Sequence, residues 1–226
     1  MKTAWGVVLT ALVLLAPGHA SAVILNGSFE SPDILNPPAI VTVPVGGSIG
    51  AWTVVGIPGG SVHHVSNAYT EGGTLFFTAQ DGDQFVDLTG PANQGPNGVQ
   101  QTVATTPGAT YTLTFWVGNQ DDTEPGYILP SMISLSIDGV PAGVFGHGDD
   151  TLNDITWRQF SHIFVAASTS TTITFINQTP PADNLAGLDN VALVQGVLGV
   201  PEPASLLLVG GPLLGMAAWL RRRKRD

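Results

Sequence analysis

The chain has 226 residues, no cysteine and a formal net charge of −10. The absence of cysteine excludes a disulfide framework and a thiol nucleophile. Its 7 basic residues are Lys2, Arg158 and five at the carboxyl end. Because phosphate binding needs clustered Lys and Arg, this distribution excludes a nucleic-acid partner.

The first 22 residues have the order of a secretory signal peptide. Lys2 supplies the positive start, residues 5–15 are apolar, and Ala20-Ser21-Ala22 is a small-residue cleavage site. Gly18-His19-Ala20 is a competing site. We expect a signal-peptide helix at 1–22, cleavage after Ala22, and one exported domain at 23–199.

Alternating apolar and polar residues predict β-strands through this domain. In the segment 110–117, Tyr111 and Phe115 lie on one face and Trp116 on the other. The pattern predicts strands at Trp52–Val55, Gln84–Leu88, Val99–Val103, Thr110–Val117, Ile133–Ile137, Phe160–Val165, Thr172–Phe175 and Leu188–Val194, with long loops at Gly90–Gly98 and Gly118–Pro130. Many short strands separated by turns are typical of an all-β antiparallel sandwich.

Several short motifs follow one another along these strands, and they include Asn26–Glu30, Gln84–Leu88, Gln100-Gln101, Pro107–Leu113 and Leu188–Val191. In this order the chain from Ile24 to Val194 resembles the galactose-binding-like jelly rolls. It is most similar to bacterial choice-of-anchor domains and their relatives among plant cell-wall proteins of unknown function. It is also similar to the carbohydrate-binding modules of cellulases and xylanases. The resemblance implies a jelly-roll β-sandwich and a carbohydrate ligand.

In a jelly roll the first and last strands commonly lie close together, which would bring Glu30 and Asp189 together. Two carboxylates that meet in a folded protein repel unless a cation lies between them. The resemblance implies a structural calcium ion (Ca2+) on Glu30 and Asp189, with backbone carbonyls around Ser28 as further ligands. The alternative is that both carboxylates cap turns through backbone hydrogen bonds.

The densest acidic segment is 81–87. It lacks the Gly and Glu positions of an EF-hand loop, so we expect Asp81 and Asp83 to shape a turn and Asp87 to be exposed on a strand. A metal or ligand role is the alternative. No acidic residue lies in an apolar sequence context that would raise its pKa, so we predict no catalytic residues and no enzyme activity.

The histidines do not form a predicted metal site. His63 and His64 point to opposite faces of a strand, so they chelate one ion poorly. His147 lies in the Gly-rich segment 146–150, which we expect to be flexible, and His162 alternates with two phenylalanines. We expect turn or core positions for all of them.

Aromatic side chains are the expected contacts for sugar rings. Trp116, on the second face of its strand, is the preferred ligand platform, whereas Trp52 and Trp157 are expected to pack in the core or at an edge. The Thr-rich segment 168–174 is reminiscent of ice-binding surfaces, but it has no repeat that would extend the array.

The carboxyl end has three parts: Pro201, Glu202 and Pro203, an apolar run at 204–220, and a basic end that begins Arg221, Arg222, Arg223. This tail, 200–226, resembles the PEP-CTERM sorting signal of Gram-negative bacteria. As a helix the run reaches about 26 Å, less than a hydrocarbon core of about 30 Å. The resemblance implies a hydrophobic transmembrane helix held in the inner membrane until an exosortase cleaves near Pro-Glu-Pro. A permanent anchor is the alternative.

Removal of both signals leaves Arg158 as the single basic residue and 15 of the 17 acidic residues, so the exported domain carries about −14. Such a surface suits divalent cations and neutral sugars. We expect a non-catalytic cell-surface or extracellular-matrix protein that binds carbohydrate, such as the exopolysaccharide with which PEP-CTERM systems are associated. The alternative is a structural or adhesive matrix protein without a sugar site. A glycoside-acting enzyme and an ice-binding protein are less favoured.

Overall fold

The computed structural model describes residues 23–34, 38–93, 95–120, 130–149, 153–180 and 185–196. The predicted signal-peptide helix and the whole sorting tail, including its apolar run at 204–220, lie outside these ranges. So does most of the predicted loop Gly118–Pro130. Within the described ranges, no helix is long and apolar enough to cross a membrane.

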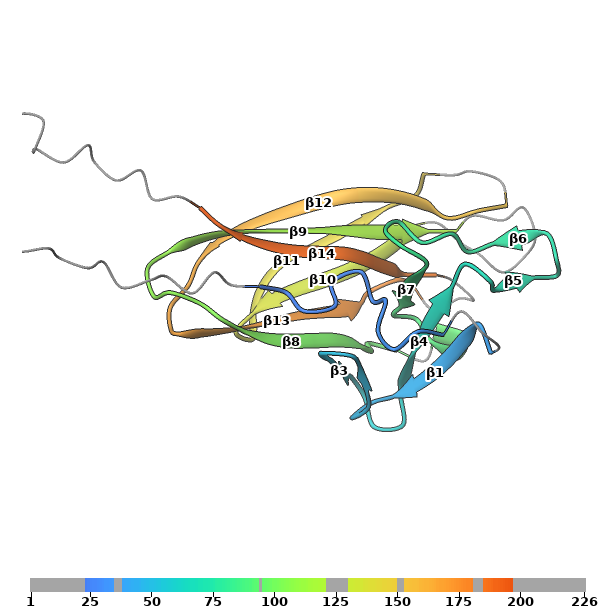
Figure 1. The fold of residues 1–226 in the computed structure, drawn as a ribbon, viewed down its shortest axis with the longest axis horizontal. Helices are drawn as coiled ribbons and strands as arrows, with labels where there is room; N and C mark the ends of the chain where they lie inside the picture. Colours follow the sequence, from blue (N-terminus) through green and yellow to red (C-terminus); the bar gives the residue numbers. More distant parts are fainter. Residues whose placement is uncertain are drawn as a thin grey trace, which may run out of the picture.

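Most described residues belong to two six-stranded antiparallel sheets that pack face to face (Figure 1). The first sheet contains, in spatial order, β1 (Ile40–Pro44), β4 (Ser61–Ser66), β7 (Gln84–Asp87), β14 (Gly187–Gln195), β9 (Thr110–Asn119) and β12 (Thr156–Val165). The second contains β11 (Val140–His147), β10 (Ser131–Ile137), β13 (Ser170–Asn177), β8 (Gly98–Ala104), β3 (Trp52–Val55) and β2 (Ser48–Ile49). A short hairpin, β5 (Thr70–Glu71) and β6 (Leu75–Phe76), and a 3-10 turn, η1 (Pro91–Asn93), complete the described elements. The domain is the all-β jelly-roll sandwich that the sequence predicts.

Alternation along the strands places the large apolar side chains between the two sheets. Tyr111 and Phe115 of β9 are fully buried, as their shared face predicts. The Phe115 ring centroid lies 4.9 Å from that of Phe175 in β13, so the two sheets meet in a direct aromatic contact. Trp52 of β3 joins this core, with its ring centroid 6.2 Å from that of Phe175.

A second apolar cluster covers part of the outer face of the first sheet, at the end where β5 and β6 lie (Figure 1). Its buried members are Val65, Leu75, Phe77, Phe85, Ile155 and Leu185. Trp157 of β12 packs against it, with its ring centroid 5.5 Å from that of Phe85. Gly118 and Gly187 lie beneath this ring, where an added Cβ would come within 2.8 and 2.9 Å of its carbon atoms. Trp157 is therefore a packing residue, as predicted.

The beginning of the described chain is joined to the last strand. The Val191 amide of β14 donates to the Gly27 carbonyl at 2.9 Å. A Cβ on Gly27 would lie 2.1 Å from the Val191 oxygen, so this approach requires glycine. The Trp52 indole donates to the Asn26 carbonyl at 2.9 Å, which ties the same segment to the second sheet. The expected proximity of the two ends of the domain is confirmed.

All of the predicted strands are present. Trp52–Val55 has its predicted bounds, whereas β12 begins earlier than predicted, at Thr156 rather than Phe160. The strands that were not predicted are β1, β2, β4, β5, β6 and β11. Of these, β2, β5 and β6 have two residues each, and β1, β2 and β11 are edge strands. Pro141 and Gly143, whose φ is 142°, disguise the alternation of β11.

Two predictions about local surroundings are wrong, the flexible position of His147 and the exposure of Asp87. His147 ends β11, is only 4% exposed, and its Nε2 lies 2.8 Å from the Val117 carbonyl oxygen, which agrees with the core position expected for it. Gly146 and His147 are not flexible because they pair with β10. Asp87 is not exposed but 6% accessible, because β7 lies inside the first sheet, between β4 and β14.

Candidate functional site

An open pocket of about 320 Å³ lies beside the second sheet, where β3 stops pairing with β8. Thr53 of β3 is paired with Gln100 of β8, and β8 then continues without a β3 partner. We call this hollow the Gln100 pocket. It is lined by Leu25, Ala51, Thr53, Gln100, Gln101 and Thr102.

The alternation of β8 decides which side chains this pocket receives. Val99 and Val103 are buried in the core, so Gln100 and Thr102 point to the outer side of the sheet. The Thr102 hydroxyl lies 2.8 Å from that of Thr172 on β13, which holds it in place. The pocket floor is therefore set by the regular pleat of the sheet.

One wall of the pocket is fixed by a pair of hydrogen bonds. Gln101 is buried, and its Oε1 accepts from the Leu25 amide while its Nε2 donates to the Leu25 carbonyl, both at 2.8 Å. The Gln101 side-chain amide thus makes with the amino-terminal segment the pair of hydrogen bonds that a neighbouring strand would otherwise make. Leu25 is thereby held at the pocket with 59% of its surface exposed.

The chemistry of the pocket is polar and uncharged. The side chains of Gln100 and Thr53 make no hydrogen bond to another described residue, so their donors and acceptors are open to a ligand. A primary amide offers two donors and a carbonyl acceptor, and a hydroxyl offers both functions. Among the residues that the structure describes, no acidic, basic or aromatic side chain lines the pocket. Such a site suits a neutral ligand rich in hydroxyl groups rather than an ion.

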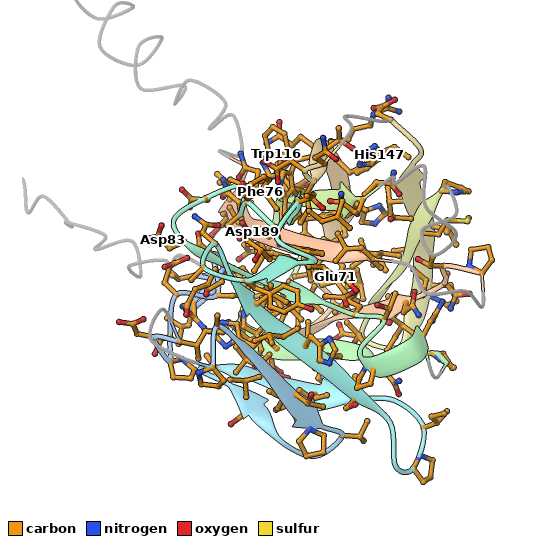
Figure 2. All side chains as sticks on the ribbon, turned by 90° about the vertical axis from the view of Figure 1, so that its right-hand side faces the viewer. Glu71, Phe76, Asp83, Trp116, His147 and Asp189 are labelled. Atoms are coloured by element: carbon orange, nitrogen blue, oxygen red, sulfur yellow. The ribbon has the colours of Figure 1, made fainter. Side chains whose placement is uncertain are left out.

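The predicted calcium residues lie elsewhere and share one loop. Asp189 of β14 accepts on Oδ2 from the amides of Gln80 and Asp81, at 2.8 and 3.0 Å. Glu30 accepts on Oε1 from the amides of Asp83 and Gln84, at 2.9 and 2.8 Å. Both carboxylates thus cap the loop 80–84 through backbone hydrogen bonds, which confirms the alternative interpretation. Figure 2 shows Asp83 and Asp189 on the same side of the sandwich.

The loop itself is a tight turn, as predicted for Asp81 and Asp83. Gly82 has φ of 73°, and a Cβ there would lie 2.5 Å from the Glu30 Oε1. The Ser28 hydroxyl donates to Asp81, and the Asn67 amide donates to Asp83 at 3.1 Å. All the acidic groups of the loop therefore have protein partners.

The electrostatics of Asp189 reflect its burial. Burial raises the pKa of Asp189 to about 7, with a smaller contribution in the same direction from the charge of Asp81, although three backbone hydrogen bonds oppose the rise. The prediction that no acidic residue has a raised pKa is therefore wrong for Asp189, which is fully buried in the structure. A bound cation would lower this pKa. In the described part of the chain, however, no group of three or more His, Cys, Asp or Glu side chains is arranged to hold a metal ion. The described donor set therefore fits the capping role, and calcium binding stays a prediction.

The three tryptophans of the domain have different surroundings. Trp52 is fully buried, and Trp157 covers Gly118 and Gly187. Trp116 is half-buried on the outer face of the first sheet, with Asp189 on one neighbouring strand and Gln159 on the other. The alternation of burial along β9 confirms its predicted position on the second face of the strand. It lies on the sheet opposite the Gln100 pocket, and its role as a ligand platform stays a prediction.

His63 and His64 point away from each other, as predicted. The His63 Nδ1 lies 3.9 Å from the Asp87 carboxylate, and the His64 Nε2 lies 2.8 Å from the Phe29 carbonyl oxygen. Burial raises the pKa of Asp87, against which Thr89, the Ala186 amide and His63 act. Burial also lowers the pKa of His63. The His63 contact therefore joins β4 to β7, whereas the His64 contact joins β4 to the amino-terminal segment.

Gln100 and Thr53 were not predicted from the sequence as ligand-binding residues. Gln100-Gln101 was noted only as a motif of the jelly-roll resemblance. The signal was present in part, because the alternation of 98–104 places Gln100 on the outer face. What the sequence lacks is the register, which pairs Gln100 with Thr53 from a distant strand.

Comparison with known proteins assigns the chain to a family. A family model described as "Protein of unknown function (DUF642)" matches residues 22–194. The chain belongs to the DUF642 family. No curated protein matches this DUF642 chain.

Solved structures that resemble the DUF642 domain have low sequence identity to it. The structure of TmCBM61 in complex with β-1,4-galactotriose is 15% identical, with a TM-score of 0.41, and the match covers 78% of this chain and 100% of that one. A family 35 carbohydrate-binding module from Clostridium thermocellum is 11% identical, with a TM-score of 0.41 and coverages of 68% and 96%. The arabinose-bound α-L-arabinofuranosidase MgGH51 is 12% identical, with a TM-score of 0.46 and coverages of 79% and 27%. At these values the likeness does not extend to a ligand.

Proposed function

We propose that this DUF642 protein is a non-catalytic carbohydrate-binding protein and that the Gln100 pocket receives the sugar. The observation that carries the proposal is the lining of this pocket: open amide and hydroxyl groups beside the exposed Leu25, with no charged side chain. Sugars present hydroxyl groups that both donate and accept, and an apolar ring face that packs on an aliphatic side chain.

The negative charge of the domain favours a neutral carbohydrate over an anionic one as the ligand. With about −14 on the expected exported domain and Arg158 as its single base, the surface repels polyuronates and sulfated glycans. Arg158 is engaged with Asp149 in an ion pair. A neutral polysaccharide, such as the exopolysaccharide of the producing cell, meets no such repulsion.

The location that suits this activity is outside the cytoplasm. We place the domain at the cell surface or in the extracellular matrix of a Gram-negative bacterium, after cleavage behind Ala22 and exosortase processing near Pro201-Glu202-Pro203. The resemblances of the two ends of the chain support this. Mass spectrometry of the protein from its host tests it, because both new termini can be read directly. A mature protein that retains 204–220 would show a permanent membrane anchor instead.

A binding experiment with the full-length chain in a mild detergent tests the proposed activity. We expect neutral polysaccharides in a native gel to retard the protein and polygalacturonate not to do so. Gln100→Ala should abolish most of the retardation, whereas Thr112→Val, on the outer face of the first sheet, should not. Absence of retardation by any glycan would favour the alternative, a structural or adhesive matrix protein without a sugar site.

A further inference from the structure

The Gln100 pocket is one point on a continuous row of polar side chains that crosses the second sheet. Ser136 of β10 pairs with Thr174 of β13, Thr174 with Gln100 of β8, Gln100 with Thr53 of β3, and Thr53 with Ser48 of β2. These five strands are consecutive neighbours in the sheet. We call Ser136, Thr174, Gln100, Thr53 and Ser48 the polar row.

The polar row faces outward along its whole length. Each of its members alternates with a buried apolar residue, such as Leu135 in β10, Ile173 in β13 and Val54 in β3. Because neighbouring strands lie about 4.8 Å apart, four strand spacings give the row a length of roughly 19 Å. The row is thus far longer than a single sugar ring and runs perpendicular to the strands.

The polar row differs from the rows beside it in its hydrogen bonds. On one side, the hydroxyls of Thr102 and Thr172 bond to each other at 2.8 Å. On the other side, the Ser134 hydroxyl donates to the Ile176 carbonyl at 3.3 Å. No side chain of the polar row makes a hydrogen bond to another described residue. Its donors and acceptors are therefore open along the full width of five strands.

We propose that the polar row is an extended binding track for a neutral, unbranched polysaccharide that lies across the strands, with the Gln100 pocket near its centre. This inference rests on the proposed carbohydrate-binding function and names its ligand class. The row is regular, uncharged and free of bulky side chains, so successive sugar units of a linear chain meet similar polar groups. A branched or anionic chain does not match this surface.

An extended track predicts how binding affinity depends on the length of the sugar chain. It offers no aromatic side chain on which a ring can stack, so each sugar gains only hydrogen bonds and aliphatic contacts. A hydrogen bond contributes a net 0.5–1.5 kcal/mol, or roughly three- to tenfold in affinity. Binding strength should therefore accumulate along the row, and a disaccharide should bind much more weakly than a hexasaccharide.

A test uses the full-length chain in detergent and oligosaccharides of two, four and six sugars made from the neutral polysaccharide that retards it most. By calorimetry, we expect affinity to rise at least tenfold from two sugars to six. Thr174→Val and Ser136→Ala, both away from the pocket, should each lower hexasaccharide affinity roughly three- to tenfold and leave disaccharide affinity unchanged. Thr112→Val, on the other sheet, is the matched control.

The outcomes separate the track from the proposed function. If Gln100→Ala abolishes binding while Thr174→Val and Ser136→Ala have no effect at any length, the pocket binds sugar but the track is overturned. Equal affinity for two and six sugars overturns the track in the same way. If no glycan binds the wild-type chain, the proposed function fails first and the track fails with it. Circular dichroism of each variant confirms that the sheet is intact.

Discussion

Glu30 and Asp189, from opposite ends of the domain, accept backbone hydrogen bonds from the two halves of a single loop, 80–84. Asp189 is fully buried and Glu30 is exposed. The loop therefore connects the amino-terminal segment to the last strand, although it belongs to neither. The conformation of the loop depends on both carboxylates. They contribute unequally to its stability, because water can replace the exposed Glu30 more easily than the buried Asp189.

The unequal burial predicts unequal effects of removing these carboxylates. Asp189→Ala should lower the free energy of unfolding by about 1–3 kcal/mol, because a fully buried carboxylate is lost and the part-buried amides of Gln80 and Asp81 lose their acceptor. Glu30→Ala should cost less than about 1 kcal/mol, because Glu30 is exposed and water reaches the Asp83 amide that it leaves. Urea unfolding of the full-length chain measures both. Gln159→Ala, on the exposed surface of β12, is the control, and equal losses from the two carboxylate variants would contradict this account.

Calcium addition tests the other interpretation of the same residues. The capping geometry predicts that the loop is stable without a metal, so a chelator should not change the melting temperature. If calcium does bind Glu30 and Asp189, it should raise the melting temperature of the wild type and not of Asp189→Asn. Isothermal titration supplies the direct measurement. No heat on adding calcium, with no effect of chelator, ends the calcium hypothesis.

The buried ring of His64 should make stability fall in acid. Burial lowers the pKa of His64, and its bond to the Phe29 carbonyl opposes this in part. The unfolded chain has the ordinary histidine pKa of about 6.5, so below that pH it takes up a proton that the folded ring resists. The contribution of His64 to the free energy of unfolding should therefore decrease as pH falls from about 7 to about 5, with no such effect above about 7.

Comparison with His64→Gln isolates this effect from other titrating groups. Asp87 and Asp189 have raised pKa values and give the opposite slope, while His63 gives the same slope as His64, and all three remain in the variant. In urea unfolding at several pH values, the free energy of unfolding of His64→Gln minus that of the wild type should increase as pH falls from about 7 to about 5. If the free energy of unfolding depends on pH identically in the variant and the wild type, protonation of His64 does not contribute to this dependence.

The contact between Trp157 and two glycines predicts a packing effect. Gly118→Ala places a methyl group within 2.8 Å of the Trp157 ring, which must shift from Phe85. Overpacking of this kind typically costs about 1–3 kcal/mol. Thermal unfolding monitored by near-ultraviolet circular dichroism should show a lower melting temperature and a changed tryptophan signal. Gly139→Ala is the comparison variant. Its added Cβ has no heavy atom within 4 Å, but Gly139 has φ of 78°. This variant therefore measures the stability lost through backbone strain without overpacking.

The sequence predicted most of the strands because alternation is a local property, as in β9, where Tyr111 and Phe115 are buried and Trp116 faces outward. It also predicted that Glu30 and Asp189 would be brought together, because the jelly-roll order implies it. It did not predict the burial of Asp87, which depends on β4 and β14 on either side of β7. Local residues do not reveal such neighbours.

The candidate site was missed for the same reason. The polar row consists of one residue from each of five strands, and no two of them are adjacent in sequence. Each strand alone shows only an ordinary Ser, Thr or Gln on a solvent face. The row appears when the register of every pair is known. Trp116 was preferred because an aromatic residue is conspicuous in a single strand.

The hydrogen bond between Gly27 and Val191 has a consequence for the order of events in folding. In a chain that emerges amino-terminus first, from a ribosome or from a membrane pore, Gly27 cannot make this bond until β14 has also emerged. Such distant pairings are slow to form, because the intervening chain must be ordered first. Since β14 also lies between β7 and β9, the first sheet can be completed only when nearly all residues of the domain are present.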